Sequence, residues 1–304
     1  MSTNASIKTT NLSYQYSKGV QTLFDINLNV ERGSIYGFLG PNGSGKTTTL
    51  SLILGLLNKQ KGDIEIFGQH LHANRISILK KVGSLIETPS LYGHLTATEN
   101  LEVYRQVYGV SKSRINDVLE VVGLGDTGKK TAKKFSLGMK QRLSIALALL
   151  PNPELLILDE PSNGLDPAGI IELRELIKTL NSKYGMTILI SSHLLGEVEK
   201  MVSHIGIIFK GRMLFQGQLS ELHSFQRKGS KLLINTSDNE AAIKLLEEYH
   251  PEREEDTVCV AYHDQKQVAA IQRTLNQNNL EVYLLHPKAN DLEQLFIDLT
   301  SVQS

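Results

Sequence analysis

One glycine-rich stretch has the residue types and spacing of a loop that binds phosphate. It matches the pattern G-x-x-x-x-G-K-[ST] and consists of Gly40, Pro41, Asn42, Gly43, Ser44, Gly45, Lys46 and Thr47. Glycines let backbone N–H groups turn toward phosphate oxygens without a clash from a Cβ atom. Lys46 would pair with the β and γ phosphates of a triphosphate, and Thr47 would ligate Mg²⁺. Thr48 extends this nucleotide-binding set into the following helix, whose dipole also favours anions.

A second candidate is the acidic pair Asp159 and Glu160, which directly follows the apolar run 155–158. Ligands of parallel sheets bind at the carboxyl ends of the strands. There Asp159 is suited to hold the metal, directly or through water, and Glu160 could accept a proton from the attacking water. Such a pair alone is also common at helix caps and surfaces. The phosphate loop in the same chain favours the nucleotide site.

The elements that must position these motifs predict an α/β fold. The loop lies between the apolar segment 35–39 and a helix-like run at 47–57. Short, continuously apolar runs at 155–158, 187–190 and 205–209 are typical of a parallel sheet covered on both faces. Earlier in the chain, apolar and polar residues alternate with a period of two over 24–30, which predicts one half-buried strand in an antiparallel arrangement.

The sequence also predicts a helical subdomain at about 89–150 and a separate C-terminal domain. Thr96 and Glu99 have the spacing of a capping box, and the helical pattern after them ends at Gly109. The pattern loosens into a polar stretch at 218–230, after which a new series of elements begins. Strands are expected at 232–234, 258–262 and 282–285, and helical faces at 242–249, 268–275 and 292–299. We therefore expect one domain at 1–222 and a small α+β domain at 223–304.

Five motifs occur in the order found in ATP-binding cassette (ABC) transporters, and the chain resembles their nucleotide-binding subunit over about residues 5–220. The motifs are the loop at 40–47, Phe135 to Arg142, Asp159-Glu160-Pro161, Gly164-Leu165-Asp166 and Ser191-Ser192-His193. The resemblance implies the P-loop NTPase fold of ABC ATPases, with a mixed-sheet core and an antiparallel N-terminal β subdomain. It also implies ATP-driven head-to-tail dimerisation, with a second copy or a closely related ABC subunit.

The resemblance also implies roles for further site residues. Ser136 and Gly138 would contact the γ-phosphate held by the opposite subunit, although their segment departs from the commonest Leu-Ser-Gly-Gly-Gln at three positions. His193 matches the switch histidine that contacts the γ-phosphate, and Asp166 belongs to the nucleotide-binding set. Tyr16 resembles the aromatic residue that stacks on adenine, and the nearby Tyr14 offers a ring of the same kind.

Glu87 stands where most of the family has a glutamine that touches Mg²⁺ and the attacking water and faces the membrane subunit. A carboxylate is also a hard oxygen ligand, so metal binding is preserved while one negative charge is added. This version of the loop resembles that of exporters that protect bacteria from lantibiotics and similar peptide antibiotics, including bacitracin-resistance systems. We therefore place Glu87 in the metal-binding and catalytic sets, the latter with Glu160 and His193.

Composition limits the other functions. The 304 residues contain 32 Lys plus Arg and 32 Asp plus Glu, so no net charge attracts nucleic acid. No apolar run approaches the roughly 20 residues that span a bilayer, and the first ten residues lack a secretory signal. We expect a peripheral subunit on the cytoplasmic face of the membrane, held by an integral-membrane permease. A soluble ABC-type ATPase switch with an assembly or regulatory role is the alternative.

Three other patterns in the sequence are weaker evidence of function. His70 and His72 could suggest a metal pair, but no other ligand cluster accompanies them in the sequence, which favours a solvated loop. The basic run 129–134 could meet anionic lipid headgroups or simply solvate a loop. Residues 252–256 indicate an acidic turn in the small domain.

Overall fold

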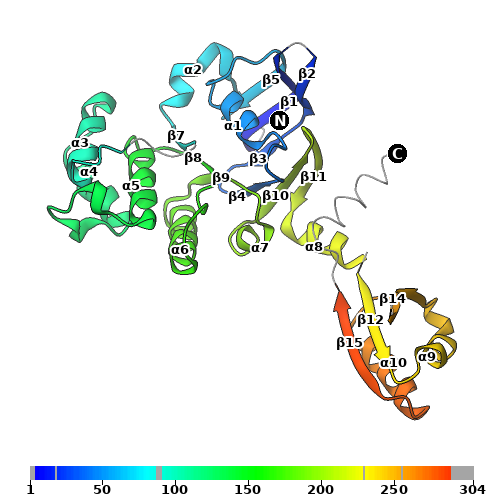
Figure 1. Cartoon of the computed structure of the whole chain (residues 1–304). Coiled ribbons are helices and arrows are strands. Elements are labelled where there is room, and N and C mark those ends of the chain that lie inside the picture. Colours follow the sequence, from blue (N-terminus) through cyan, green and yellow to red (C-terminus); the bar gives the residue numbers. More distant parts are fainter. Residues whose placement is uncertain (1–3, 18, 87–90, 229, 255, 289–304) are drawn as a thin grey trace. The chain divides into compact units, whose positions relative to one another are not determined.

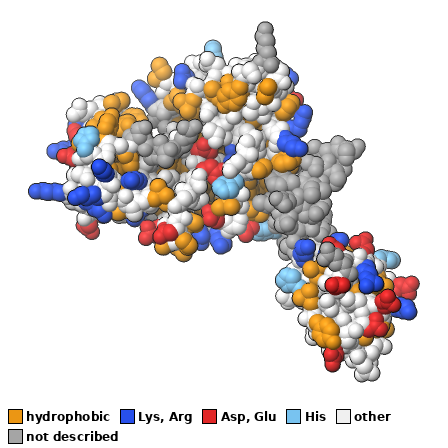
Figure 2. Space-filling model, in the orientation of Figure 1, with side chains coloured by type: hydrophobic (Ala, Val, Ile, Leu, Met, Phe, Trp, Pro, Cys, Tyr) orange, Lys and Arg blue, Asp and Glu red, His pale blue; other side chains and the backbone are white. Residues whose placement is uncertain are grey.

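The computed structural model describes residues 4–17, 19–86, 91–228, 230–254 and 256–288, and the chain divides into two compact units (Figure 1). The first unit is Met1–Gln218 and the second is Leu219–Ser304. On the face drawn in Figure 2, acidic, basic and apolar side chains are interspersed, in keeping with the balanced composition.

A six-stranded mixed sheet forms the centre of the first unit, in the order β11-β10-β4-β9-β8-β7. Every neighbouring pair is parallel except β10 and β11. The strands are β4 (Ile35–Leu39), β7 (Val82–Leu85), β8 (Leu155–Asp159), β9 (Thr187–Ser192), β10 (His204–Phe209) and β11 (Arg212–Gln218). The apolar runs predicted as parallel strands form β8, β9 and β10. All residues of β8 and β9 are buried, as expected for strands covered on both faces.

A second sheet of the first unit is antiparallel and has five strands. They are β1 (Ala5–Ser17), β2 (Val20–Ile26), β3 (Asn29–Glu31), β5 (Lys61–Ile66) and β6 (Gln69–His70). The alternation over 24–30 is divided between β2 and β3, so the prediction of one continuous strand was wrong. The long strand β1 pairs with β2 near its end and with β3 near its start, and the chain bends at Asp25, where φ is 49°. Ile26, Leu28 and Val30 are buried as predicted, whereas Phe24 is half-buried.

Helices and short 3-10 turns complete the first unit. They are α1 (Lys46–Ile53), α2 (Leu71–Leu79), α3 (Ala97–Tyr108), α4 (Ser113–Val121), η1 (Gly125–Thr127), η2 (Ala132–Lys134), α5 (Leu137–Leu149), α6 (Pro167–Tyr184) and α7 (Leu195–Val198). Helices α3, α4 and α5 pack on one another and form the predicted helical group beside the central sheet (Figure 1).

Local sequence signals predicted the ends of α3 correctly and the end of α1 incorrectly. The capping box is confirmed, because Thr96 Oγ1 accepts from Glu99 N while Glu99 Oε2 accepts from Thr96 N, and α3 ends before Gly109 in the left-handed conformation. Helix α1 ends at Ile53, earlier than the predicted 57, because Leu54 caps it and Gly55 turns the chain with a φ of 65°. No helix in the described ranges is long and apolar enough to cross a membrane.

The second unit contains a βαββαβ arrangement. Helix α8 (Leu219–Lys228) comes first, followed by β12 (Lys231–Thr236), α9 (Asn239–Leu245), η3 (Glu247–Tyr249), β13 (Glu252–Glu254), β14 (Thr257–Ala261), α10 (Gln265–Gln277) and β15 (Val282–Lys288). Its antiparallel sheet has the order β13-β14-β12-β15. Apolar residues of β12 and β14 pack with those of α9 and α10 in a core of their own.

Two expectations for this part of the chain were wrong and one lies outside the description. Helix α8 forms within the stretch that looked merely polar, and its Leu222 is buried. The supposed acidic turn contains the short edge strand β13, which pairs with β14. The helical face predicted at 292–299 lies outside the described residues. The chain's sole cysteine, Cys259, is buried in β14, and its Sγ atom donates to Glu254 Oε2 at 3.0 Å.

Candidate functional site

The glycine-rich loop joins the carboxyl end of β4 to α1, as predicted. A Cβ atom at Gly40 would lie 2.2 Å from the carbonyl oxygen of Ile208, so only glycine fits there. Gly45 precedes α1 with a φ of 109°, a conformation that side chains disfavour. Pro41, Asn42 and Gly43 are exposed at the tip of the loop. The buried hydroxyl oxygen of Ser44 has no hydrogen-bond partner among the described residues, which fits a loop shaped to meet an added acceptor.

Lys46, Glu160 and His193 form a connected group that we call the nucleotide triad. The Lys46 side chain is 5% exposed, and its Nζ atom donates to the carbonyl of Gly40 at 2.7 Å and lies 3.1 Å from Glu160 Oε1. The other carboxylate oxygen of Glu160 lies 2.8 Å from His193 Nδ1. A buried ammonium needs such partners to offset its desolvation. The triad thus brings together three residues that the sequence assigned to phosphate binding and catalysis.

Glu160 is held in an unusual backbone conformation. Its φ is 47°, a region that residues other than glycine rarely occupy and that is often found at functional sites. The backbone N–H of Glu160 donates to the hydroxyl of Ser191 at 2.9 Å. Ser191 Oγ also donates to Asp159 Oδ1, so one serine of β9 fixes the last residue of β8 and the acid that follows it. The sequence prediction gave Ser191 no role of its own, although it lies in the same motif as His193.

Thr47 and Asp159 meet at the edge of the central sheet. Thr47 Oγ1 donates to Asp159 Oδ2 at 2.8 Å, although 112 residues separate them in sequence. Asp159 is 7% exposed. Hydroxyl and carboxylate oxygens are the hard ligands that Mg²⁺ prefers, so this pair fits the predicted metal. Glu87, the third predicted ligand, lies outside the described residues.

The two candidate aromatic residues differ in their surroundings. Tyr16 is 62% exposed, and its hydroxyl lies 3.2 Å from Thr48 Oγ1 at the start of α1. Tyr14 packs against the core, with its ring edge-on to Tyr16 at 5.0 Å between centroids. Only Tyr16 therefore offers a largely open ring beside the phosphate loop.

Ser136 and Asp166 each cap a helix. Ser136 Oγ accepts from Met139 N at 3.2 Å at the start of α5, and Asp166 Oδ1 accepts from Gly169 N at 2.9 Å at the start of α6. A Cβ atom at Gly138 would meet only Leu165 Cδ2, at 3.9 Å, so its backbone is open. The described residues show no hydrogen bond from Ser136 or Asp166 to the phosphate loop of the same chain. These residues stay predicted contacts for a second subunit.

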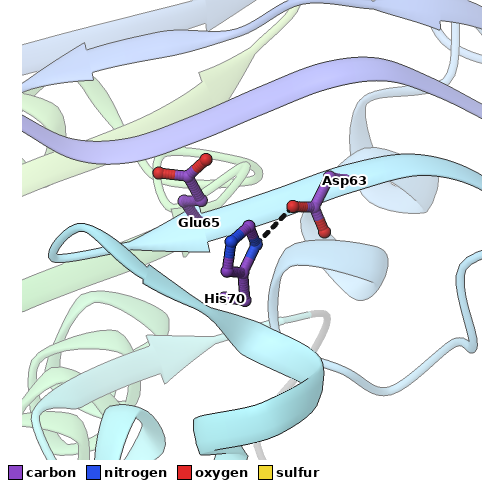
Figure 3. Close-up of side chains that lie close together, drawn as sticks. All are labelled: Asp63, Glu65 and His70. Carbon is purple, nitrogen blue, oxygen red and sulfur yellow. Dashed lines mark ion pairs between the residues drawn. The ribbon is translucent and has the colours of Figure 1, made fainter.

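A second group of charged side chains lies on the hairpin of β5 and β6 (Figure 3). Glu65 pairs with His70 across the hairpin, and Asp63 lies two residues along β5 on the same face. Asp63 contacts His70 Nδ1 and lies 2.9 Å from Lys59 Nζ. We call Lys59, Asp63 and His70 the hairpin triad.

Sequence reasoning missed the hairpin triad, since it found no ligand cluster beside His70. Three potential metal ligands, Asp63, Glu65 and His70, come within 4.8 Å of one another. Burial acts to raise the pKa of Asp63, but hydrogen bonds from Lys59, the backbone of Ile64 and His70 outweigh it and hold the pKa below its ordinary value. With the Asp63 carboxylate already engaged in this way, the group is a partly exposed ion-pair network.

Comparison with known proteins agrees with this geometry. Residues 23–163 match the ABC transporter family. The bacitracin transport ATP-binding protein BcrA of Bacillus licheniformis is 44% identical over 299 residues, which cover 96% of each chain. The chain therefore belongs to the ABC transporter family as one of its ATP-binding proteins, and it is an ATPase of the P-loop type.

Two further matches extend the comparison. The lantibiotic transport ATP-binding protein SrtF of Streptococcus pyogenes is 46% identical over 210 residues, covering 69% of this chain and 90% of that protein. The ATP-binding cassette MJ0796, solved as a dimer in a post-hydrolysis state with ADP and phosphate, aligns with a TM-score of 0.62 and 25% identity. That alignment covers 70% of this chain and 98% of the solved one. It lends independent support to the fold.

Proposed function

We propose that this chain is the ATP-hydrolysing subunit of a membrane exporter that protects bacteria from peptide antibiotics. The observation that carries the proposal is the similarity to the bacitracin transport protein, which extends over 96% of both chains and so includes the C-terminal unit. The shorter similarity to the lantibiotic transport protein supports the same cargo class. These relatives do not favour the alternative of a soluble switch without transport.

The nucleotide triad supports the hydrolytic roles. A triphosphate in the loop competes with Glu160 for the Lys46 ammonium, because both are anionic and Lys46 Nζ lies 3.1 Å from Glu160. Glu160, released from that ion pair, accepts a proton from the attacking water. His193 Nδ1 lies 2.8 Å from the same carboxylate and orients that carboxylate. The imidazole also donates a hydrogen bond to the γ-phosphate. In this proposal the triad passes from an internal ion-pair network to the catalytic arrangement when ATP binds.

Thr47 and Asp159 support the proposed Mg²⁺ site. When bound, Mg²⁺ neutralises charge that develops on the phosphates. The 2.8 Å contact between Thr47 and Asp159 already brings the two oxygen donors together, and Ser191 orients Asp159 through its other oxygen. Backbone N–H groups of the glycine-rich loop at Asn42, Gly43 and Gly45 bind the phosphate oxygens around this pair, since Gly40 and Ser44 already donate within the chain.

The exposed ring of Tyr16 supports a role in adenine stacking. A ring that is 62% exposed beside Thr48 can cover a base, whereas Tyr14 contributes to the core. Tyr16→Ala should weaken ATP binding by about 1–3 kcal/mol. Fluorescence titration with an ATP analogue measures this loss, and an unchanged affinity would exclude the stacking role.

We propose that the complete transporter contains two copies of this chain, or one copy with a closely related subunit, and an integral-membrane permease. Ser136, Gly138 and Asp166 complete the nucleotide site across that dimer. Their open or helix-capping positions support such a contact, because a helix N-terminus with free donors favours an anion. The permease holds the subunit on the cytoplasmic face of the membrane.

The whole proposal is tested in a sensitive bacterial host that expresses the chain together with its integral-membrane permease. Growth in bacitracin and in a lantibiotic is compared for wild type, Glu160→Gln and Lys59→Ala. Resistance should disappear with Glu160→Gln and persist with Lys59→Ala at equal amounts of membrane-bound subunit. Equal resistance in all three strains, or in none, would reject antibiotic export while leaving the ATPase assignment to be judged from purified protein.

The proposed role of Glu87 is to couple hydrolysis to transport more than to catalyse it. Glu87→Ala is therefore expected to lower resistance in the same host more than it lowers ATPase activity of the assembled transporter. Glu87→Gln serves as the matched control, because it keeps an oxygen ligand without the charge. Loss of resistance strictly in step with loss of ATPase activity would contradict the coupling role.

A further inference from the structure

A cavity of about 470 Å³ lies at the edge of the central sheet opposite to the phosphate loop. Its walls include residues directly before β8, such as Glu154, and directly before β9, such as Met186. Because these strands are parallel, their amino ends share one edge and Asp159 lies at the other. The cavity is thus separate from the nucleotide site, and its volume is in the usual range for small-molecule sites.

Three elements that carry predicted nucleotide-site residues at one end meet around this cavity at their other ends. Helix α5 is capped by Ser136 and ends at Leu149, and helix α6 is capped by Asp166 and ends at Tyr184. Strand β8 runs from Leu155 to Asp159. Helix α4 of the helical group supplies a further wall through Arg114 and Val118. A ligand here would contact both the helical group and the central sheet.

Positive charge exceeds negative charge around the cavity. The ionisable residues in its walls are the cations Arg32 and Arg114 and the anion Glu154. Glu154 is already paired with Arg32 at 2.9 Å and with Lys81 at 2.9 Å. Glu154 thus pairs with two cations and not with Arg114, which leaves positive charge in the walls that favours a further anion.

Arg114 is fixed in place with binding capacity left over. One guanidinium nitrogen donates to the backbone carbonyl of Leu149 at 2.9 Å, which anchors the side chain to the end of α5. The buried Nε atom has no hydrogen-bond acceptor within the described ranges. This Nε atom is closed to the cavity, so a ligand would be bound by the terminal guanidinium nitrogens, whose planar arrangement matches a carboxylate or phosphate group. Arg114 thus provides a positioned donor for an anionic group.

Among the remaining wall residues, Asn152 is polar, and one part of the wall is apolar. Val118, Leu180 and Met186 are buried side chains, and the half-exposed ring of Tyr184 stands beside them. We propose that this cavity binds a small amphipathic anion, with a carboxylate or similar group on Arg114 and Arg32 and an apolar body against this wall. Neither a purely apolar molecule nor a simple inorganic ion would use both halves of the cavity.

Isothermal titration calorimetry of the full chain with sodium octanoate tests the proposal. Octanoate should bind to wild type, whereas acetate, which lacks the chain, and 1-octanol, which lacks the charge, should bind more weakly. Arg114→Gln and Arg32→Gln should each weaken octanoate binding about tenfold, the usual effect of losing a hydrogen bond to a charged group. Competition by inorganic phosphate then shows whether the head-group position also accepts a phosphate.

The matched control is Arg75→Gln. Arg75 also anchors a guanidinium nitrogen on a backbone carbonyl, that of Gly55 at 2.9 Å, and it lines another, smaller cavity. This variant should bind octanoate as wild type does. Thermal unfolding without ligand identifies any loss of fold in Arg114→Gln, and Arg32, whose side chain is 65% exposed, supplies a variant that keeps the fold. Three results would each overturn the proposal: no octanoate binding to wild type, binding unaffected in both cavity variants, or equal affinity for 1-octanol.

Discussion

The nucleotide triad and the hairpin triad bring the same residue types together, a lysine, a carboxylate and a histidine, in two regions of one unit. In both, the lysine and the histidine contact opposite oxygens of the carboxylate. The settings differ. The lysine of the nucleotide triad is 5% exposed and that of the hairpin triad 33%, while the histidines are 32% and 63% exposed.

The difference lies in what surrounds the charges. The nucleotide triad stands at the carboxyl edge of a parallel sheet, beside a glycine loop, with its carboxylate on a strained backbone at Glu160. In the hairpin triad, Asp63 and His70 lie on the antiparallel hairpin of β5 and β6, and Lys59 lies just before β5. Water screens exposed pairs and reduces their energy to between about 0 and 1 kcal/mol, whereas desolvated charges interact strongly. The same substitution made at both triads therefore shows whether a residue's effect on ATP binding and hydrolysis comes from its side-chain type or from its surroundings.

The largest difference in ATPase rate is expected between substitutions of the two carboxylates, Glu160 and Asp63. Glu160→Gln should lower the rate of MgATP hydrolysis by about 10²–10⁴-fold, because the amide cannot accept a proton, while ATP still binds. Asp63→Asn should hydrolyse ATP at the wild-type rate. Phosphate release and nucleotide binding are measured in parallel on purified protein. Equal rates for Glu160→Gln and wild type would remove Glu160 from the role of base.

The lysines are expected to differ in ATP binding. Lys46→Ala should lower the affinity for MgATP by about a hundredfold, because several charge-assisted hydrogen bonds to phosphate are lost. Lys59→Ala, the same change in the hairpin triad, should leave the affinity unchanged. Equilibrium binding of a fluorescent ATP analogue provides the measurement. If Lys46→Ala bound ATP like wild type, the loop would not be the nucleotide site.

A smaller difference in ATPase rate is expected between substitutions of the two histidines, His193 and His70. His193→Ala should reduce hydrolysis by about tenfold to a hundredfold, since it removes one oriented donor from the transition state. His70→Ala should have no effect on the rate. Single-turnover hydrolysis at saturating ATP isolates this step from binding. A similar rate for both variants would show that the contact between His193 and Glu160 has no catalytic role.

The smallest effect concerns the stability of the hairpin triad. The pKa of Asp63 is below its ordinary value in the folded chain, so its contribution to stability is present above the unfolded pKa of about 3.9 and disappears as pH falls through the folded pKa. Wild type should exceed Asp63→Asn by less than about 1 kcal/mol at pH 7, because solvent screens the pair. Denaturant unfolding at pH 7 and at acidic pH checks this, and a gap that widens on acidification would contradict the sign.

Features whose cause is local were predictable from the sequence. The phosphate loop and the capping box of Thr96 and Glu99 each depend on residues within a few positions. The apolar runs that became β8 and β9 were equally clear. Placement of Asp159 beside Thr47 followed from the rule that ligands gather at the carboxyl ends of parallel strands.

Features that depend on pairing between distant segments were not predictable in the same way. The division of β2 from β3 arises because β1 changes partners along its length. The hairpin triad needs the register that places Glu65 opposite His70. Likewise, the sequence assigned Lys46 and Glu160 to one site but could not show that they form an ion pair. Local propensity carries no information on such contacts.

Cys259 has a practical consequence for measuring motion in this protein. It is the only thiol in the chain and is buried, and burial together with the hydrogen bond to Glu254 raises its pKa, which keeps the reactive thiolate scarce. Maleimide dyes and spin labels should therefore not react with the native chain. A cysteine introduced at an exposed position of the first unit could then carry a label alone, and subunit closure could be followed without first removing a natural attachment point.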